Sequence, residues 1–210
     1  MIQSRFLLVC GVGLLLFATG CANLSKPSNK TSFYTLEYAA QPMNDLKPLP
    51  FVLRVERFSA SPLYQTENIV YREKPFKKES YSFYQWRAKP EDMVSYFLMR
   101  DLQQSGLFKA VLPAAGGMPA THLVFGNVEE FLEADQEPAW QAVLAVTIVL
   151  LGQKEPDIMK SILLQKTYTA TETCKLKNPQ AVAEAMSRAM AQVSQQMIRD
   201  IHQALVITTP

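Results

Sequence analysis

The sequence predicts an α+β domain in which two main helices pack on an antiparallel or mixed β-sheet. Three observations support this prediction. Runs of aromatic and β-branched residues recur along the chain, two segments carry apolar residues at helical spacing, and short polar loops separate the last three strand candidates. About 190 residues remain after a leader, enough for one domain with a real core.

The leader is a secretory signal pattern. Arg5 supplies a positive charge, and Phe6–Phe17 is an apolar run, shorter than the roughly 20 residues that a membrane-spanning helix needs. Ala18–Cys21 looks like a bacterial lipobox, although Ala18 replaces the Leu most often seen there. We expect residues 1–20 to be a lipoprotein signal peptide and Cys21 to carry the acyl chains, palmitate included. In the alternative, an ordinary signal peptide, Cys21 is incidental.

Residues 21–30 are polar, short and Pro-containing, which predicts a lipidated tether in front of a single domain at 31–207. Several acyl chains, each contributing about 0.8 kcal/mol per buried methylene, make such an anchor effectively permanent. No Asp follows Cys21, since Ala22 and Asn23 stand there. In a Gram-negative host this favours the outer membrane, with the domain facing the periplasm.

Charge and cysteine content exclude several classes of protein. The chain has 21 Lys and Arg against 19 Asp and Glu, so nothing indicates nucleic acid as a partner. Cys10 leaves with the leader and Cys21 is acylated, which leaves Cys174 alone and without an internal disulfide partner. We expect Cys174 to pack as a small apolar residue, the alternative being a disulfide between two chains.

The first half of the domain contains four strand candidates. Thr31–Tyr38 and Phe51–Phe58 are rich in aromatic and β-branched residues, and in the second run apolar and charged side chains alternate between the two faces. Asn68–Glu73 and Tyr81–Trp86 flank the polar stretch Lys74–Ser80, which predicts a hairpin. Trp86 precedes a helix, so we expect it to fill the corner between strand and helix.

Two segments predict helices. Glu91–Ser105 follows Pro90, carries acidic residues in its first turn and ends before Gly106. Pro179–Leu205 follows Asn178, a favourable N-cap, and its apolar stripe includes three methionines that we interpret as core.

Between the helices, Leu107–Leu112 predicts a short strand. His122–Glu133, Trp140–Leu151 and Ile158–Thr173 predict an antiparallel meander. Its middle strand is apolar on both faces. Either both faces are buried within the domain, or one presents apolar area to a second subunit or a lipid-like ligand.

No segment predicts catalysis. The chain has only two histidines, His122 and His202, neither in a metal-spaced cluster, and no nucleophile, phosphate-loop or dinucleotide motif. We therefore expect no enzyme activity, no cofactor and no metal. An acidic group near one turn is expected to be solvated, weak cation binding being the alternative; its members are Glu129, Glu130, Glu133, Asp135 and Glu137.

With these residues described, the chain resembles the ABC-type transport auxiliary lipoprotein family, which includes the paraquat-inducible C-type lipoproteins. The order of short motifs carries the resemblance: a lipobox, Phe33–Leu36, Ile69–Arg72, Tyr84–Trp86 and an Ala-rich last helix. The stretch between Arg72 and Trp86 is longer and more charged than the family leads us to expect. The resemblance implies a fold similar to the N-terminal domain of TolB and a role beside an inner-membrane ABC transporter and a mammalian-cell-entry-type protein that move lipids between membranes.

Two hypotheses follow. In the first, the protein is a non-enzymatic outer-membrane accessory of such a transport system, and homo-oligomers are open to it. Its predicted partner or assembly surface comprises Tyr71, Phe83, Tyr84, Trp86, Val143, Val146 and Ile148. In the second, the protein is a freestanding periplasmic carrier of a lipid or small ligand, which predicts an apolar cavity.

Overall fold

The computed structural model describes residues 30–115, 117–153 and 155–207. The predicted signal peptide, Cys21 and all but the last residue of the predicted tether lie outside these residues. Residues 31–207, as far as the structure describes them, form one compact unit.

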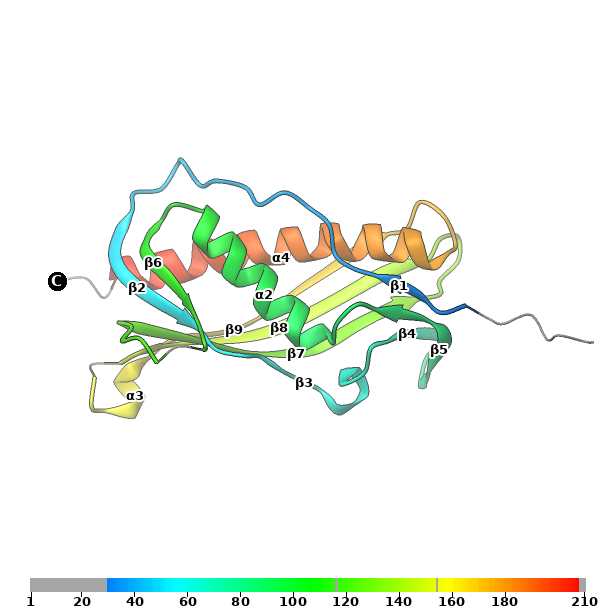
Figure 1. Ribbon diagram of the computed structural model, residues 1–210, viewed down its shortest axis with the longest axis horizontal. Helices are drawn as coiled ribbons and strands as arrows, with labels where there is room; N and C mark the ends of the chain where they lie inside the picture. The colour runs from blue at the N-terminus through cyan, green and yellow to red at the C-terminus, as the bar shows by residue number, and fades with distance from the viewer. Residues whose placement is uncertain (1–29, 116, 154, 208–210) are drawn as a thin grey trace, which may run out of the picture. The chain divides into compact units, whose positions relative to one another are not determined.

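The described residues form one mixed β-sheet and three α-helices (Figure 1). Two long helices, α2 and α4, cover the same face of the sheet (Figure 1). The predicted α+β fold with two main helices is therefore confirmed. In chain order the elements are β1 Ser32–Tyr34, β2 Leu49–Val55, β3 Ser59–Ala60, the 3₁₀ turn η1 Pro62–Tyr64, β4 Asn68–Lys74, β5 Lys77–Trp86, α2 Pro90–Gln104, β6 Phe108–Pro113, β7 His122–Ala134, β8 Gln141–Gly152, α3 Ile158–Ser161, β9 Ile162–Thr173 and α4 Pro179–Ile207.

Strand β7 is the common neighbour that joins the two halves of the sheet. It pairs in parallel with β2, β3 and β4 and antiparallel with β8, which pairs antiparallel with β9. The predicted meander is thus confirmed, and the parallel pairs make the sheet mixed. The remaining order runs β1-β5-β4-β7-β2-β6.

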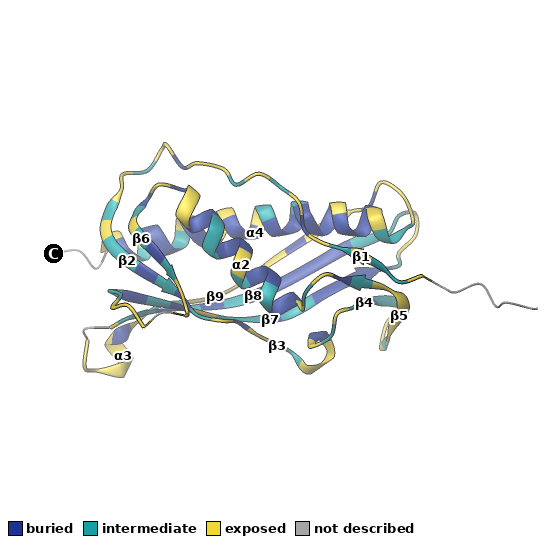
Figure 2. Ribbon diagram, in the orientation of Figure 1, coloured by how far each residue is buried: buried dark blue, intermediate teal, exposed yellow. Residues whose placement is uncertain are grey.

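The core lies between α4 and the meander. Every second residue of β8 points at the helix and is fully buried (Figure 2), namely Ala142, Leu144, Val146, Ile148 and Leu150. The predicted stripe of α4, methionines included, is buried as well. The Asn178 side chain accepts a hydrogen bond of 2.9 Å from the backbone N–H of Ala181, so the predicted N-cap is confirmed.

The first predicted strand, Thr31–Tyr38, is too long, because β1 ends at Tyr34. Beyond that point the chain leaves β5 and lies on the helices. The Tyr38 ring stacks on Phe97 with centroids 5.3 Å apart, and its hydroxyl donates to Asp101 Oδ2 at 2.6 Å. Side-chain anchors on α2 replace a strand neighbour, so β-forming residues remain extended without pairing.

The third meander strand also begins later than predicted. Ile158–Ser161 form the short helix α3, because the Asp157 side chain accepts a hydrogen bond of 3.0 Å from the N–H of Met159. Local capping by an Asp therefore overrides the apolar pattern that predicted a strand.

Strand β2 lies two to three residues earlier than the predicted Phe51–Phe58, because the chain leaves it after Val55 to place Phe58 over β7. The Phe58 ring lies directly on Gly126. A Cβ atom at position 126 would lie 2.1 Å from that ring, so only glycine permits this approach.

Candidate partner-binding surface

Strands β1, β4 and β5 form one side of the sheet, which joins the meander where β4 pairs with β7. Strand β1 pairs with β5 in parallel only from Ser32 opposite Tyr84 to Tyr34 opposite Trp86. Strand β4 pairs with the other edge of β5, with a register shift between Asn68 and Val70. Among the described residues, the edge of β5 before Tyr84 has no strand neighbour.

A row of tyrosine rings crosses these three strands. The Tyr71 and Tyr81 ring centroids lie 4.6 Å apart, those of Tyr81 and Tyr84 5.3 Å, and those of Tyr84 and Tyr34 6.3 Å. Two of the hydroxyls are hydrogen-bonded. Tyr71 donates to Glu79 at 2.5 Å and Tyr81 to Glu133 at 2.8 Å. The row is therefore held rigidly by its own contacts.

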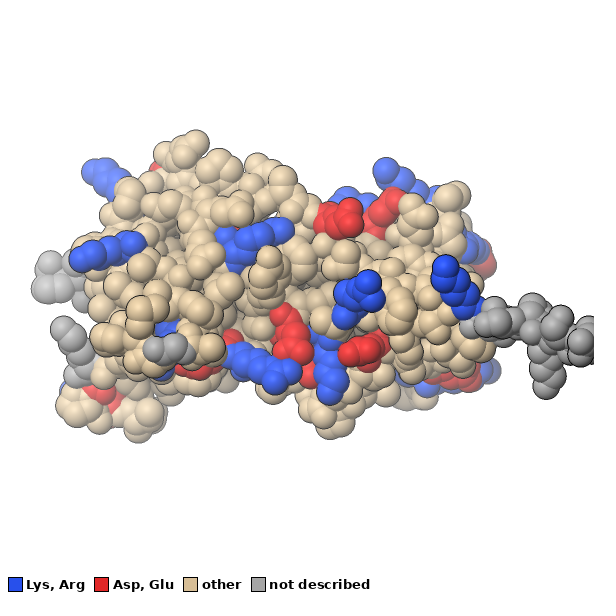
Figure 3. Space-filling view, in the orientation of Figure 1, with Lys and Arg blue, Asp and Glu red and all other residues tan. Residues whose placement is uncertain are grey.

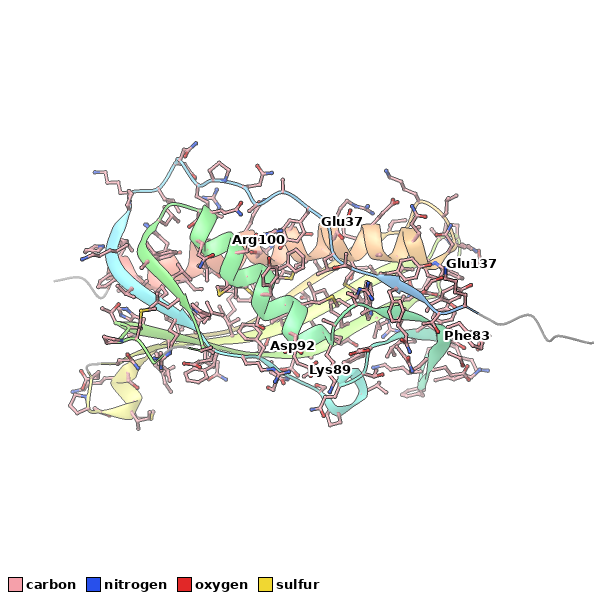
Figure 4. The ribbon with its side chains drawn as sticks, viewed as in Figure 1. Glu37, Phe83, Lys89, Asp92, Arg100 and Glu137 are labelled. Carbon is pink, nitrogen blue, oxygen red and sulfur yellow. The ribbon has the colours of Figure 1, made fainter. Side chains whose placement is uncertain are left out.

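The outer members of this region are open to solvent. Phe33 is 50% exposed, Phe83 42% and Tyr84 37%, and the Arg87 guanidinium lies 5.0 Å from the centre of the Phe33 ring. Figure 4 shows Phe83 at the same end of the domain as Glu137 in the β7–β8 turn. We call these outer rings and the tyrosine row the aromatic edge, comprising Phe33, Tyr34, Tyr71, Tyr81, Phe83 and Tyr84.

Exposed aromatic rings grouped on a rigid scaffold are typical of protein-binding surfaces, because they offer large contact area at little entropic cost. On the face shown in Figure 3, Lys and Arg are interspersed with Asp and Glu. The aromatic edge therefore distinguishes this side of the domain more than net charge does.

A buried carboxyl group lies behind the tyrosine row. Glu133 has no exposed surface and accepts the Tyr81 hydroxyl at Oε1. Burial and the neighbouring Asp135 carboxyl together raise the pKa of Glu133 to about 8, although the hydrogen bond from Tyr81 acts in the opposite direction. Glu133 Oε2 and Asp135 Oδ1 are both buried without another partner, so a proton on Glu133 gives each a partner in the other.

The prediction that the acidic group is solvated is therefore wrong for Glu133, which is buried. Glu137 is exposed, as expected. The sequence did carry one signal. Glu133 ends the apolar run Phe131-Leu132, and in β7 it lies opposite Ala142 of the buried strand β8. Residue type alone favoured a solvated position. The register instead places the Glu133 side chain on the same face of the sheet as Ala142, which is buried.

The residues predicted for a partner surface separate into two groups. Phe83 and Tyr84 are exposed and Tyr71 is half-buried, all on the aromatic edge. The other four lie in the core. Trp86 is 1% exposed and packs edge-to-face on Phe131, which fits its expected corner role, while Val143, Val146 and Ile148 lie in β8. Their side chains face other parts of this chain, so we leave these four out of the candidate surface.

Both faces of strand β8, which the sequence predicted to be apolar, are mostly buried within the domain. The face toward α4 is fully buried, and on the other face Val143 is 8% and Ala145 4% exposed. This second face becomes partly exposed at Thr147. The Thr147 and Thr167 hydroxyls hydrogen-bond to each other there at 2.8 Å. Burial within the domain accounts for most of the apolar pattern.

The remaining candidates are structural. Cys174 is buried, as expected, and burial raises its pKa to about 11. His122 packs edge-to-face on Phe51, and burial lowers the pKa of its ring. His202 Nε2 donates to the Lys47 carbonyl at 2.8 Å. Within the described ranges, no cluster of His, Cys, Asp and Glu suits a metal ion, and no helix is long and apolar enough to cross a membrane.

Comparisons with known proteins agree with this structure. Residues 34–198 match the family model described as ABC-type transport auxiliary lipoprotein component. Protein XCC0632 from Xanthomonas campestris superimposes with a TM-score of 0.75 at 19% identity, covering 85% of this chain and 100% of that one. The hypothetical protein CT253 from Chlamydia trachomatis gives 0.54 at 8% identity, with 74% and 98% coverage. These two structures show the fold alone. A search of curated proteins finds no relative that matches.

Proposed function

The chain belongs to the ABC-type transport auxiliary lipoprotein component family, and we propose that it is a non-catalytic accessory of an ABC-type transporter that acts by binding other proteins. In this proposal acylated Cys21 holds the domain at the outer membrane, facing the periplasm. The partner is a mammalian-cell-entry-type protein of the same system, and the cargo is lipid.

The aromatic edge is the observation that carries this proposal. Phe33, Phe83 and Tyr84 keep between 37% and 50% of their surface in solvent although the domain has a well-filled core elsewhere. Leaving such rings exposed forgoes about 25 cal/mol of stabilisation for each Å² that could be buried. Contacts of Tyr84 with Tyr81 and Tyr34, and of Phe33 with Arg87, hold these two rings in place, so a partner meets a partly preorganised surface.

A freestanding lipid carrier is the second candidate function, and the cavities favour it less. One hollow of about 690 Å³ is lined by Arg72, Glu73, Lys74, Lys78 and Asp135 beside a few apolar residues. Acyl chains require an apolar lining, because a charged group facing hydrocarbon loses its hydration. Mass spectrometry of the protein purified without detergent separates the two functions, since a carrier retains lipid in defined stoichiometry.

The test of the accessory function is chemical crosslinking in intact envelopes followed by purification of the protein. We expect the wild type to recover a component of an ABC transport system, and the double substitution Phe83→Ser with Tyr84→Ser to recover at least about tenfold less, as expected for removal of binding hot spots. Tyr96→Ser is the matched control, because Tyr96 is 57% exposed on α2, away from the aromatic edge.

Two outcomes would count against the proposal. Recovery of no transport-system protein by the wild type would remove the accessory function. Equal recovery by all variants would remove the aromatic edge as its surface. A homo-oligomer stays a prediction, and light scattering of the purified protein measures it directly.

A further inference from the structure

The β4–β5 turn is much tighter than the charged stretch of the sequence suggested. A turn over Lys74–Ser80 was predicted, but the strands continue until Lys74 pairs with Lys77, which leaves Pro75 and Phe76 as the whole turn. Lys77 of β5 forms an ion pair with Glu73 of β4 at 2.8 Å, which joins the two strands, and a second one with Glu79 of its own strand at 3.0 Å.

Phe76 is unfavourable in this turn on two counts. Its φ angle is 65°, a region that a bulky side chain rarely adopts, and its side chain is fully exposed. Pro75 fixes the first turn position, and a positive φ at the second is the type II pattern, which favours Gly or Asn. Neither stability nor turn geometry explains a phenylalanine here, so its contact lies outside this domain.

The surroundings of Phe76 combine apolar and cationic groups. Leu63 of η1 is 45% exposed and lines the same hollow of about 690 Å³ as Phe76. The hollow is also lined by Arg72, Lys74 and Lys78. Its carboxylates are Glu73, already paired with Lys77, and Asp135 beside Glu133. Arg72 and Lys78 share one further carboxylate, since each lies 3.8 Å from Glu130. An apolar tip surrounded by long cationic side chains suits the boundary between acyl chains and anionic headgroups.

Chain length allows the turn and the proposed anchor to meet one surface. Strand β1 runs parallel to β5 with Ser32 opposite Tyr84, and β5 spans roughly 26 Å from Phe76 to Tyr84. The ten residues of Cys21–Lys30 extend to at most about 35 Å. A bilayer that holds acylated Cys21 is therefore within reach of the turn.

We propose that the Pro75–Phe76 turn is a second membrane contact, in which Phe76 and Leu63 enter the lipid surface and Arg72, Lys74 and Lys78 face phosphate groups. This contact would set the orientation of the domain on the bilayer and keep the aromatic edge turned toward its partner. It rests on the proposed anchoring by Cys21.

The test uses the full lipidated protein in vesicles of phosphatidylethanolamine and phosphatidylglycerol, with and without a brominated phosphatidylcholine. Bromine quenches a tryptophan that enters the bilayer. We expect Phe76→Trp to lose roughly half of its added emission, as for a ring within the interfacial region. The Tyr96→Trp variant is the control on the helix-covered side, and the parent protein corrects for Trp86 and Trp140.

Each outcome decides the proposal. Selective quenching at position 76 supports it. If both variants sediment with vesicles but position 76 shows no excess quenching, the proposal is overturned. If the emission at position 76 shifts only when a transport-system protein is added, the turn contacts a protein instead of the membrane. If neither variant sediments, the anchoring fails and this contact with it, whereas crosslinking in envelopes tests the accessory function separately.

A second measurement does not depend on an introduced tryptophan. Hydrogen exchange at residues 74–78 of the lipidated wild type should slow severalfold on vesicles relative to detergent. In Phe76→Asn the slowing should disappear, while the turn persists because Asn tolerates positive φ. Equal protection in both proteins would contradict the contact.

Discussion

The meander under α4 and the aromatic edge belong to one sheet, but they differ in strand pairing and in the burial of their apolar side chains. In the meander, β7, β8 and β9 pair over almost their whole lengths, with a single register shift in each pairing, and β8 presents five fully buried side chains to one helix. At the aromatic edge, β1 has three residues, β4 and β5 pair with register shifts, and aromatic rings stay in solvent. The comparison teaches that stability is concentrated in the first region and that the second is free to carry contacts.

The largest expected effect contrasts one apolar residue from each region. Ile148→Ala should lower the free energy of unfolding by about 2–5 kcal/mol, because it leaves a cavity between β8 and α4. Phe83→Ala should change it by less than about 0.5 kcal/mol, because the ring is largely exposed. Urea unfolding followed by circular dichroism measures both. Similar losses in the two variants would mean that the edge also carries the fold.

The second effect tests the close packing at the start of the meander. Gly126→Ala should cost about 1–3 kcal/mol, because the added methyl group meets the Phe58 ring. The cost should shrink in a Phe58→Ala background, which itself is destabilised by the lost ring. A double-mutant cycle gives the coupling. Strict additivity would show that the two groups do not meet.

The third effect concerns Glu133, which lies where the two regions join, between Tyr71 of β4 and Ala142 of β8. Its folded pKa, about 8, exceeds its ordinary value of 4.5, so the folded state holds the extra proton between these values. The stabilisation is full below about 4.5 and is lost as the pH rises through about 8.

Glu133→Gln should remove this dependence, because the amide stays neutral, accepts from Tyr81 and donates to Asp135. We expect the variant to match the wild type near pH 4 and to exceed it progressively as the pH rises, by about 2–4 kcal/mol near pH 9. Urea unfolding at the two pH values supplies the difference. A constant offset between the proteins would indicate that Glu133 is charged throughout.

The smallest expected effect is a gain in stability. Phe76→Asn should raise the free energy of unfolding by about 0.5–1 kcal/mol, because Asn fits the positive φ and no buried contact is lost. Lys74→Asn is a neighbouring control without the backbone change. A loss of stability in Phe76→Asn would show that the ring supports the fold.

The same contrast explains what could be predicted from the sequence. The meander, both long helices and the Asn178 cap have strong periodicity or local capping signals, and the structure confirms them. Strand Thr31–Tyr38 was overextended because contacts of Tyr38 with α2 decide its path. The parallel pairs to β7 join distant segments, and no local pattern encodes them.

The candidate surface was predicted only in part. Aromatic residue type drew attention to Tyr71, Phe83 and Tyr84, which lie on the aromatic edge, and their role in binding a partner stays a prediction. Trp86 packs on Phe131 in its expected corner, so it should not have been placed on the surface as well. Residue type could not show that Val146 and Ile148 face α4, because burial depends on which elements cover each face. Phe76 was passed over as part of a polar loop, since neither its φ nor its exposure is visible in a sequence.

The most direct test of the central claim is site-specific photo-crosslinking in living cells. A photoreactive amino acid at position 83 should capture a protein of the ABC transport system, while the same group at position 96 should capture little of it. Capture at 83 alone would place the partner on the aromatic edge. Equal capture at both positions, or none at position 83, would contradict the account.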